Sequence, residues 1–191
     1  MKNILIVNGH SARKSLSQSI ADTYEAQVKA QGHSVHRIDL GLLSFDPILR
    51  EGYGRIQALE PDLLEAQKWI LWADHIVWVF PVWWSTFPAL LKGFIDRTFL
   101  PGFAFKYHDN DPFWDKLLTG RSTDVIYTSG TPSWVFRIFM GEPVNKVLKG
   151  ILGFSGLKPM RVLRFGGIRE LNERQVATIL EKSKMFARSY K

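Results

Sequence analysis

Short apolar runs alternate with amphipathic segments along the chain. Five compact apolar runs predict strands; they cover residues 3–7, 34–39, 75–80, 124–128 and 161–165. The longer segments between and after them carry helix start and stop signals; the helices are expected in residues 17–32, from Pro61 onward, and in residues 88–99, 142–154 and 172–190. In the first helix, Ser17 is expected to be the N-cap and Gly32 the stop, with Ile20, Tyr24 and Val28 four residues apart on one face.

This alternation of strands and helices predicts a parallel α/β sheet, wound on both sides as one domain over residues 1–191. Residues 75–80 are apolar almost throughout, as expected for a strand whose two faces are both covered by helices. Residues 34–39 are more polar and predict an edge strand. Crossover connections in such sheets are right-handed, which leaves few possible topologies.

The composition excludes several classes of chemistry. None of the 191 residues is cysteine, so disulfides, thiol catalysis, zinc ribbons and iron–sulfur clusters are ruled out. The longest uncharged apolar stretch, residues 76–91, is broken by Pro81 and Pro88 and falls short of the roughly 20 residues that span a bilayer. The amino terminus has no export-signal pattern. We therefore expect a soluble, cytoplasmic protein.

The net charge of +7 is concentrated near the carboxyl terminus. Residues 151–191 hold 9 Lys+Arg and 3 Asp+Glu, a balance of +6. Nucleic acid, an acidic membrane face or cofactor phosphates would all attract such a segment. Its charges are dispersed and no aromatic–basic surface motif accompanies them, so a solvated helix face is the preferred reading and nucleic-acid binding is not expected.

Ligands of open parallel sheets bind outside the carboxyl ends of the strands, at the point where the strand order reverses. This rule selects a first loop (residues 9–17), a second loop (residues 81–87) and a third loop (residues 129–134). The first loop brings His10, several hydroxyls and backbone N–H groups to a helix start, which predicts a phosphate site. It contains neither GxGxxG nor GxxxxGK[ST], and an N-capped surface turn is the alternative.

The second loop contains adjacent tryptophans, Trp83 and Trp84, after a buried strand. Successive strand side chains point to opposite faces, so at least one is expected to line a cleft that holds a flat aromatic ligand. Packing against a helix or a dimer partner is the alternative. The third loop is small and hydroxylated and would offer backbone donors to the polar edge of a ligand.

A hydrolase and a metal enzyme are both disfavoured. The sequence has no GxSxG elbow, and its five histidines show no HExxH or paired spacing. His75 begins a core strand and is expected to be structural.

Residues 80–99, continuing through 101–105, resemble the flavodoxin-like NAD(P)H:quinone oxidoreductases, a family that includes DT-diaphorase and many small bacterial NAD(P)H-dependent oxidoreductases. The pair His10-Ser11, the segment from Asp39 to Asp46-Pro47 and the turn 128–130 resemble the family too. The resemblance extends over about residues 3–165, and residues 80–105 are its specific part.

The resemblance implies a flavodoxin-like five-stranded sheet of order 2-1-3-4-5 with helices on both faces. It also implies a non-covalent flavin (FAD in the first place, FMN as the alternative), NAD(P)H as co-substrate, and a homodimer with the active site at the interface. The flavin phosphate would be held by His10, Ser15, Leu16 and Ser17. The edge of the isoalloxazine would lie along Pro81, Val82, Trp83, Trp84 and Ser85, and its polar rim along Thr128, Ser129 and Gly130. Phe105 and Tyr107 match positions that reach into the partner's pocket.

The sequence departs from the family at two places. Ser85 stands where the best-known members have an aromatic residue. Residues 132–137 lack the Tyr and His that handle protons in DT-diaphorase. Arg137 is the nearest replacement, as a charge for the reduced flavin or for nicotinamide phosphates.

The expected function is hydride transfer from NAD(P)H through the flavin to a quinone, azo or nitro compound by a ping-pong mechanism, with no protein nucleophile. A flavodoxin-type electron carrier and an ancillary subunit of a membrane transport system are the alternatives. Membrane contact is compatible with the basic carboxyl-terminal stretch but is not favoured.

Overall fold

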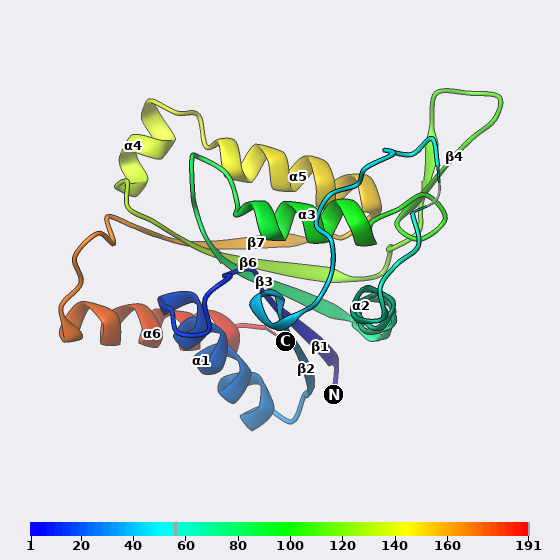
Figure 1. Cartoon of the computed structure of the whole chain (residues 1–191). Helices are drawn as coiled ribbons and strands as arrows, with labels where there is room; N and C mark the ends of the chain where they lie inside the picture. Colours follow the sequence, from blue (N-terminus) through cyan, green and yellow to red (C-terminus); the bar gives the residue numbers. More distant parts are fainter. Residues whose placement is uncertain (56, 191) are drawn as a thin grey trace.

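The computed structural model describes residues 1–55 and 57–190 and contains one five-stranded parallel sheet (Figure 1). Its strands lie in the order β2 (Ser34–Asp39), β1 (Asn3–Asn8), β3 (His75–Pro81), β6 (Ser122–Ser129) and β7 (Met160–Gly166). Counted along the main sheet this is the order 2-1-3-4-5, and all four pairings are parallel. The predicted fold class and topology are confirmed.

Helices cover both faces of the sheet, as Figure 1 shows. The helices α1 (Leu16–Ala30) and α6 (Glu173–Arg188) lie on one face, and α2 (Pro61–Trp72), α3 (Ala89–Thr98) and α5 (Pro143–Ser155) on the other. Strand residues alternate between two cores: Ile4 and Ile6 pack with α1, whereas Leu5 and Val7 pack with the opposite helices. This is the period-2 pattern of a sheet buried on both sides. Among the described helices, none is long and apolar enough to cross a membrane.

The ends of the helices follow the sequence signals with one correction. Ser15, and not Ser17, is the N-cap of α1: its Oγ accepts the Gln18 N–H at 3.1 Å, and Ser17 lies inside the first turn. Gly32 follows the end of α1 with φ +83°, a conformation that glycine adopts without steric cost. Pro61 opens α2 as expected, and Asn172 caps α6 through a capping box.

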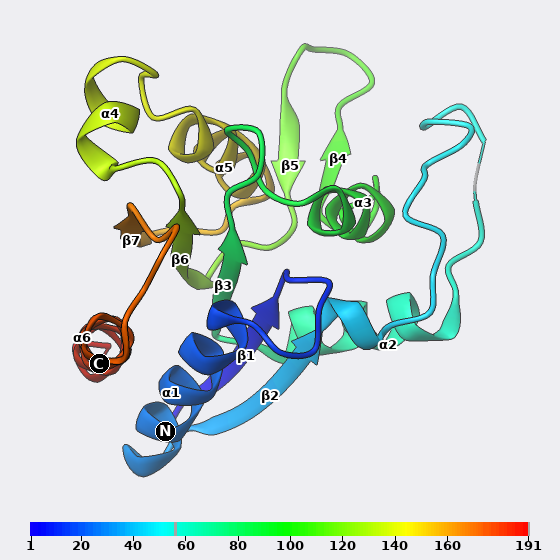
Figure 2. The same cartoon turned by 60° about the vertical axis from the view of Figure 1, so that its left-hand side comes forward.

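Three short elements were not predicted. They are the 3-10 turn Leu40–Leu42, the antiparallel hairpin of β4 (Phe105–Tyr107) and β5 (Trp114–Lys116), and the short helix α4 (Ser133–Ile138). In Figure 2 the hairpin projects beside α3, and α4 follows the carboxyl end of β6. The two hairpin strands have three residues each and α4 has six, and segments this short cannot show a hydrophobic period.

The segment between the 3-10 turn and α2 is held against α3 by a buried arginine. Arg97 is 0% exposed, and its guanidinium donates to the carbonyls of Asp46 at 2.5 Å and Ala58 at 2.8 Å and to the Glu60 carboxylate at 2.8 Å. One turn earlier, Gly93 lets the same segment approach the helix closely. A Cβ on Gly93 would lie 2.4 Å from the Pro47 Cβ and 2.5 Å from its carbonyl oxygen.

A second buried polar cluster closes the amino-terminal end of the sheet, opposite the predicted ligand loops. Asp124 accepts from Arg161 at 2.7 and 2.5 Å and from the Tyr24 hydroxyl at 2.8 Å, and His75 lies 3.5 Å away. Burial by itself would raise the pKa of Asp124, but its hydrogen bonds with His75 and Arg161 outweigh burial and hold that pKa below its ordinary value. His75 is buried and bonded to Ser122 at 2.8 Å, which confirms its structural role.

The close approach at Gly93 predicts a size limit. Gly93→Ala should lower the free energy of unfolding by about 1–3 kcal/mol, because the methyl group meets Pro47 backbone that cannot move aside without releasing the Arg97 contacts. Gly150→Ala is the matched control, since a Cβ there meets nothing within 4 Å; it should be neutral or stabilise by up to about 1 kcal/mol. Urea unfolding measures both. Equal effects at the two positions would contradict the packing seen at Gly93.

The Asp124 cluster predicts a pH-dependent loss of stability. Arg161→Gln should destabilise the protein by about 3 kcal/mol at neutral pH, because it leaves a buried carboxylate without its cation. The lowered pKa of Asp124 stabilises the fold above the ordinary value of 3.8 and ceases to do so as the pH falls below it, so the difference between wild type and variant should shrink on acidification. The control Arg164→Gln removes an ion pair with the more exposed Glu142 and should cost under about 1 kcal/mol. A difference independent of pH would refute this account.

Candidate functional site

The carboxyl ends of β1, β3 and β6 bring the three predicted loops together. The Gly9 N–H donates to the Val79 carbonyl at 2.8 Å, and the Val82 N–H donates to the Thr128 carbonyl at 2.7 Å. The rings of His10 and Trp83 meet edge to face with centroids 5.6 Å apart. These contacts connect the first loop to the second and the second to the third. The arrangement lies at the switch point of the sheet: the chain continues from β1 to β2 on one side and from β3 to β6 on the other.

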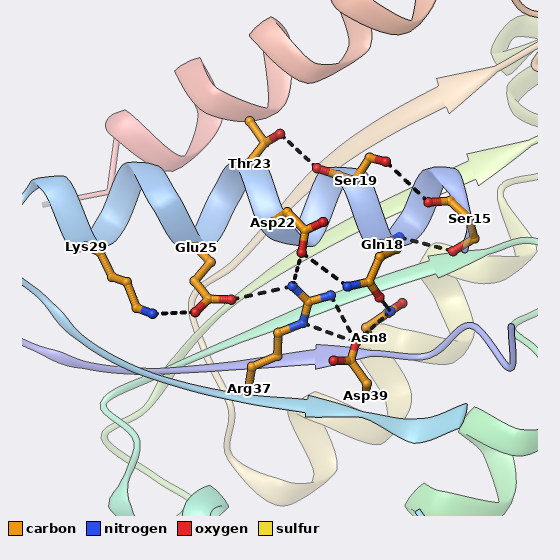
Figure 3. Close-up of polar contacts among 10 residues, drawn as sticks. All are labelled: Asn8, Ser15, Gln18, Ser19, Asp22, Thr23, Glu25, Lys29, Arg37 and Asp39. Atoms are coloured by element: carbon orange, nitrogen blue, oxygen red, sulfur yellow. Dashed lines mark hydrogen bonds and ion pairs between the residues drawn. The ribbon is translucent and has the colours of Figure 1, made fainter. Parts of the chain in front are cut away.

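A buried asparagine at the end of β1 sets the position of the first loop (Figure 3). The Asn8 amide donates to Gln18 Oε1 at 2.9 Å and to Asp39 Oδ1 at 2.8 Å, and its own oxygen accepts the His10 N–H at 3.3 Å. One side chain therefore connects β1 with the start of α1, the end of β2 and the loop itself. Sequence analysis did not select Asn8. A polar residue closing an apolar strand was the available signal.

Arg37 pairs with three carboxylates behind this asparagine. Its guanidinium donates to Asp39 at 3.1 and 2.9 Å, to Asp22 at 2.5 Å and to Glu25 at 3.5 Å (Figure 3). Burial would lower the pKa of Arg37, but its hydrogen bond to Asp22 and the charge of Asp39 outweigh it and raise that pKa. The Asp39 carboxylate, which also lines the cavity at the first loop, is therefore paired with a cation that it shares with Asp22 and Glu25.

The first loop has the donors that a phosphate requires. The Ala12 N–H donates to His10 Nδ1 at 2.9 Å, so neutral His10 carries its proton on Nε2 and can donate it to a ligand. Partial burial lowers the pKa of His10, which favours this neutral form. The first turn of α1 adds N–H groups that have no partner within the helix, together with the positive end of the helix dipole. A cavity of about 150 Å³ opens here, lined by His10, Arg13 and Gln18 among others.

Ser17 provides the test of whether a phosphate-bearing group fits. Its side chain is 1% exposed, and its Oγ has no hydrogen-bond partner in the described part of the chain. A buried hydroxyl without a partner costs about 1–3 kcal/mol, so a ligand or a water molecule is expected to complete it. Ser17 is the second residue of α1, and the start of a helix is where a phosphate would bind. The residues present therefore fit the group.

The second loop is a tight and strained turn. Trp83 and Thr86 exchange both backbone hydrogen bonds, at 2.9 and 3.0 Å, and the central residues Trp84 and Ser85 have φ of 50° and 63°. Turns of this type favour Gly, Asn or Asp, so a tryptophan there stores strain. Neither tryptophan points into the core: Trp83 is 43% exposed and Trp84 is 99% exposed. Strain of this kind collects at ligand sites.

The third loop offers its backbone rather than its hydroxyls. Thr128 and Ser129 are buried, and the Ser129 hydroxyl donates to the Thr131 carbonyl at 2.6 Å. Gly130 is partly exposed, and the side chain of Arg169 lies over it, 3.2 Å from where a Cβ would be. Contact with a ligand at this loop would therefore be made by the main chain of Gly130 and by Arg169, which the sequence did not single out.

The structure narrows the expectation for the two hairpin aromatics. Phe105 is 4% exposed and packs against Tyr53 and Phe154 in the core of its own chain, with ring centroids at 6.2 and 4.9 Å. Tyr107 is exposed, so of these two residues only Tyr107 is available to contact another subunit. Both line a cavity of about 460 Å³ between α3, α5 and the hairpin.

The contacts of Asn8 predict that its removal lowers the stability of the fold and also loosens the first loop. Asn8→Ala should cost about 2–3 kcal/mol, because it removes three hydrogen bonds of a buried group, and should increase amide hydrogen exchange in residues 10–18. The control Asn3→Ala removes one side-chain hydrogen bond, to the Trp72 carbonyl, at the opposite end of the same strand. It should cost about 1 kcal/mol and leave exchange in residues 10–18 unchanged. Faster exchange in both variants would show that Asn8 has no specific role in the loop.

Comparison with known proteins places the chain in a family. A family model described as a flavodoxin-like fold matches residues 2–185. The mouse ribosyldihydronicotinamide dehydrogenase [quinone] is 30% identical over 184 residues, covering 82% of this chain and 78% of the relative. A Haemophilus influenzae protein described as an uncharacterized NAD(P)H oxidoreductase is 29% identical over 185 residues, covering 94% and 91%.

A solved structure shows the same fold with a flavin in place. It is an FMN-dependent NADH-azoreductase from Bacillus anthracis in complex with FMN, which superposes with a TM-score of 0.73 at 23% identity over 98% of each chain. The fold, the loops at its carboxyl edge and these relatives agree with one another. The chain belongs to the flavodoxin-like family of NAD(P)H:quinone oxidoreductases.

Proposed function

We propose that this protein is a flavin-dependent enzyme that transfers hydride from NAD(P)H to a quinone, azo or nitro compound. The observation that carries the proposal is the meeting of a phosphate cradle with a strained aromatic turn at one edge of the sheet. His10 and Ser17 supply phosphate donors, and the ring of His10 contacts Trp83 of the turn. One ligand that carries both a phosphate and a flat ring system could therefore occupy both.

The protein residues would bind and orient the flavin and the substrates, and a bound flavin would supply the hydride-transfer chemistry. His10 Nε2–H and the Ser17 hydroxyl would hold the flavin phosphate at the start of α1. The backbone of Trp84 and Ser85 would lie along the edge of the ring, and the N–H groups of this turn and of Gly130 would stabilise negative charge there. No nucleophile is required of the protein.

FMN and FAD share the one phosphate that this cradle explains. No contact in the described residues selects an adenine at this site, so we propose a flavin without keeping the preference for FAD. The flavin in the Bacillus anthracis azoreductase structure is FMN.

We also propose that the enzyme is a homodimer that works in the cytoplasm. Trp83 and Trp84 of the second loop are 43% and 99% exposed, so a flavin ring held along this turn would rest on an open surface. A second subunit would cover that surface, and Tyr107 is one of the exposed aromatic residues that could extend across. The absence of cysteine supports the assignment to the cytoplasm.

Steady-state kinetics test the proposal. If NAD(P)H and the acceptor use the same exposed face in turn, double-reciprocal plots at several acceptor concentrations should be parallel. Intersecting lines would rule out shared occupancy. A flavin-loaded protein that does not oxidise NAD(P)H in the presence of a quinone would instead be an electron carrier.

Ser17 predicts opposite effects on stability and affinity. Ser17→Ala should leave the flavin-free protein as stable as the wild type or more stable by up to about 1 kcal/mol, because the hydroxyl it removes is buried without a partner. The same change should weaken FMN binding about tenfold, since a hydrogen bond to a charged phosphate is lost. Chemical unfolding and titration of flavin fluorescence measure the two effects. Ser19→Ala, which removes a hydroxyl directed at the Ser15 carbonyl, is the control and should leave the affinity unchanged.

A further inference from the structure

Another cavity, distinct from the two described above, lies between α4, the first turns of α5 and β7. Its lining is strongly basic. Its volume is about 850 Å³, within the range of sites that hold nucleotide-sized ligands. Four cationic side chains line it: Arg137 from α4, Lys146 and Lys149 from α5, and Arg164 from β7. None of the residues predicted to contact the flavin phosphate, ring edge or polar rim lines it.

The single acidic residue of the lining is already engaged. Glu142 is paired with Arg164 and also accepts the Asn145 amide at 2.8 Å. These partners lower the pKa of Glu142, with the Arg164 hydrogen bond as the main cause, so Glu142 stays ionised and opposite Arg164. Arg137, Lys146 and Lys149 are exposed and share the cavity with no further carboxylate in its lining. The cavity therefore carries an excess of positive charge.

The placement of the lysines costs stability in the absence of an anion. Lys146 and Lys149 are three residues apart on one side of α5, so their charges repel each other. Lys146 is the fourth residue of that 13-residue helix, at its positive end, where cations are disfavoured and anions are stabilised. Its Nζ is folded back to 3.2 Å from where a Cβ on Gly141 would be. An anionic ligand would relieve both unfavourable interactions.

The cavity begins where the candidate flavin site ends. Ser133 and Trp134 line it and follow Gly130 of the third loop by three and four residues. Three residues span at most about 10 Å, so one extended ligand can reach from the third loop into the cavity. Figure 2 shows α4 leaving the carboxyl end of β6, with α5 beyond it. Trp134 is 60% exposed and offers a flat surface for a base or sugar.

We propose that this cavity binds the phosphates of the dinucleotide hydride donor, and that the enzyme consequently prefers NADPH to NADH. The inference rests on the proposed function. The 2′-phosphate of NADPH carries about −1.5 to −2 charges at neutral pH, which suits a cavity with three cations in excess. Arg137 can bind a phosphate through two parallel N–H donors, and Lys146 and Lys149 act as point charges.

The test compares three hydride donors that differ in their phosphates. For the flavin-loaded Lys146→Gln/Lys149→Gln variant, kcat/KM for NADPH should fall about tenfold or more through KM, with a smaller loss for NADH. Ribosyldihydronicotinamide has no phosphate, and its kcat/KM should be unchanged. The control Lys182→Gln/Lys184→Gln makes the same charge change on exposed positions of α6 and should alter none of the three values. Equal losses for all three donors, or no loss for NADPH, would overturn the inference.

A binding measurement separates this inference from the proposed function. Calorimetric titration of the flavin-loaded protein with NADP⁺ should show binding that weakens about tenfold in the Lys146→Gln/Lys149→Gln variant and not in the α6 control. If none of the three donors reduces the flavin but NADP⁺ binding still depends on the two lysines, the site stands and the proposed reaction fails. If the enzyme turns over and NADP⁺ binds both variants equally, the reaction stands and this site is refuted.

Discussion

The structure depends on the burial of β3 between β1 and β6. All seven residues of β3 are buried, and the strand pairs in parallel with both neighbours. Because β3 is parallel to both neighbours, the carboxyl ends of the three strands lie at the same end of the sheet. The three loops that follow them are therefore held together. The contact of His10 with Trp83 and the hydrogen bond from Val82 to Thr128 follow from this constraint.

The two ends of the sheet serve different purposes. At the amino-terminal end, the cluster around Asp124 has its charges and hydroxyls paired, which stabilises the fold. At the carboxyl end, Ser17 Oγ has no hydrogen-bond partner among the described residues, and Trp84 and Ser85 are held in left-handed conformations; both features cost stability. Unpaired and strained groups beside a scaffold whose polar groups are paired are typical of a ligand site, because a bound ligand can supply the missing hydrogen bonds.

Much of the fold could be predicted because its signals are periodic and local. The five strands, their polar edge member and the ends of α1 and α2 follow from apolar runs, Gly32 and Pro61. The cap of α1 was misplaced by two residues because Ser15 and Ser17 are chemically equivalent in sequence, and only backbone geometry distinguishes them. The β4–β5 hairpin and α4 were missed because they are too short to show a period.

The meeting of the three loops could be predicted from the sequence, but the residues that support the candidate site could not. The position of the loops follows from topology, whereas the roles of Asn8, Arg37 and Arg169 arise from contacts between segments far apart in the chain. The basic cavity is of the same kind: Arg137, the α5 lysines and Arg164 are spread over 28 positions, and only the fold gathers them. Sequence alone shows their charge and not their proximity.

The central claim is that the carboxyl edge holds a flavin that NAD(P)H reduces. The most direct measurement is the visible spectrum of the purified protein, recorded after mixing with FMN or FAD and removal of free flavin, and again after anaerobic addition of NADPH. The account predicts a retained flavin absorption band that NADPH bleaches and a quinone restores. A protein that retains neither flavin would contradict it.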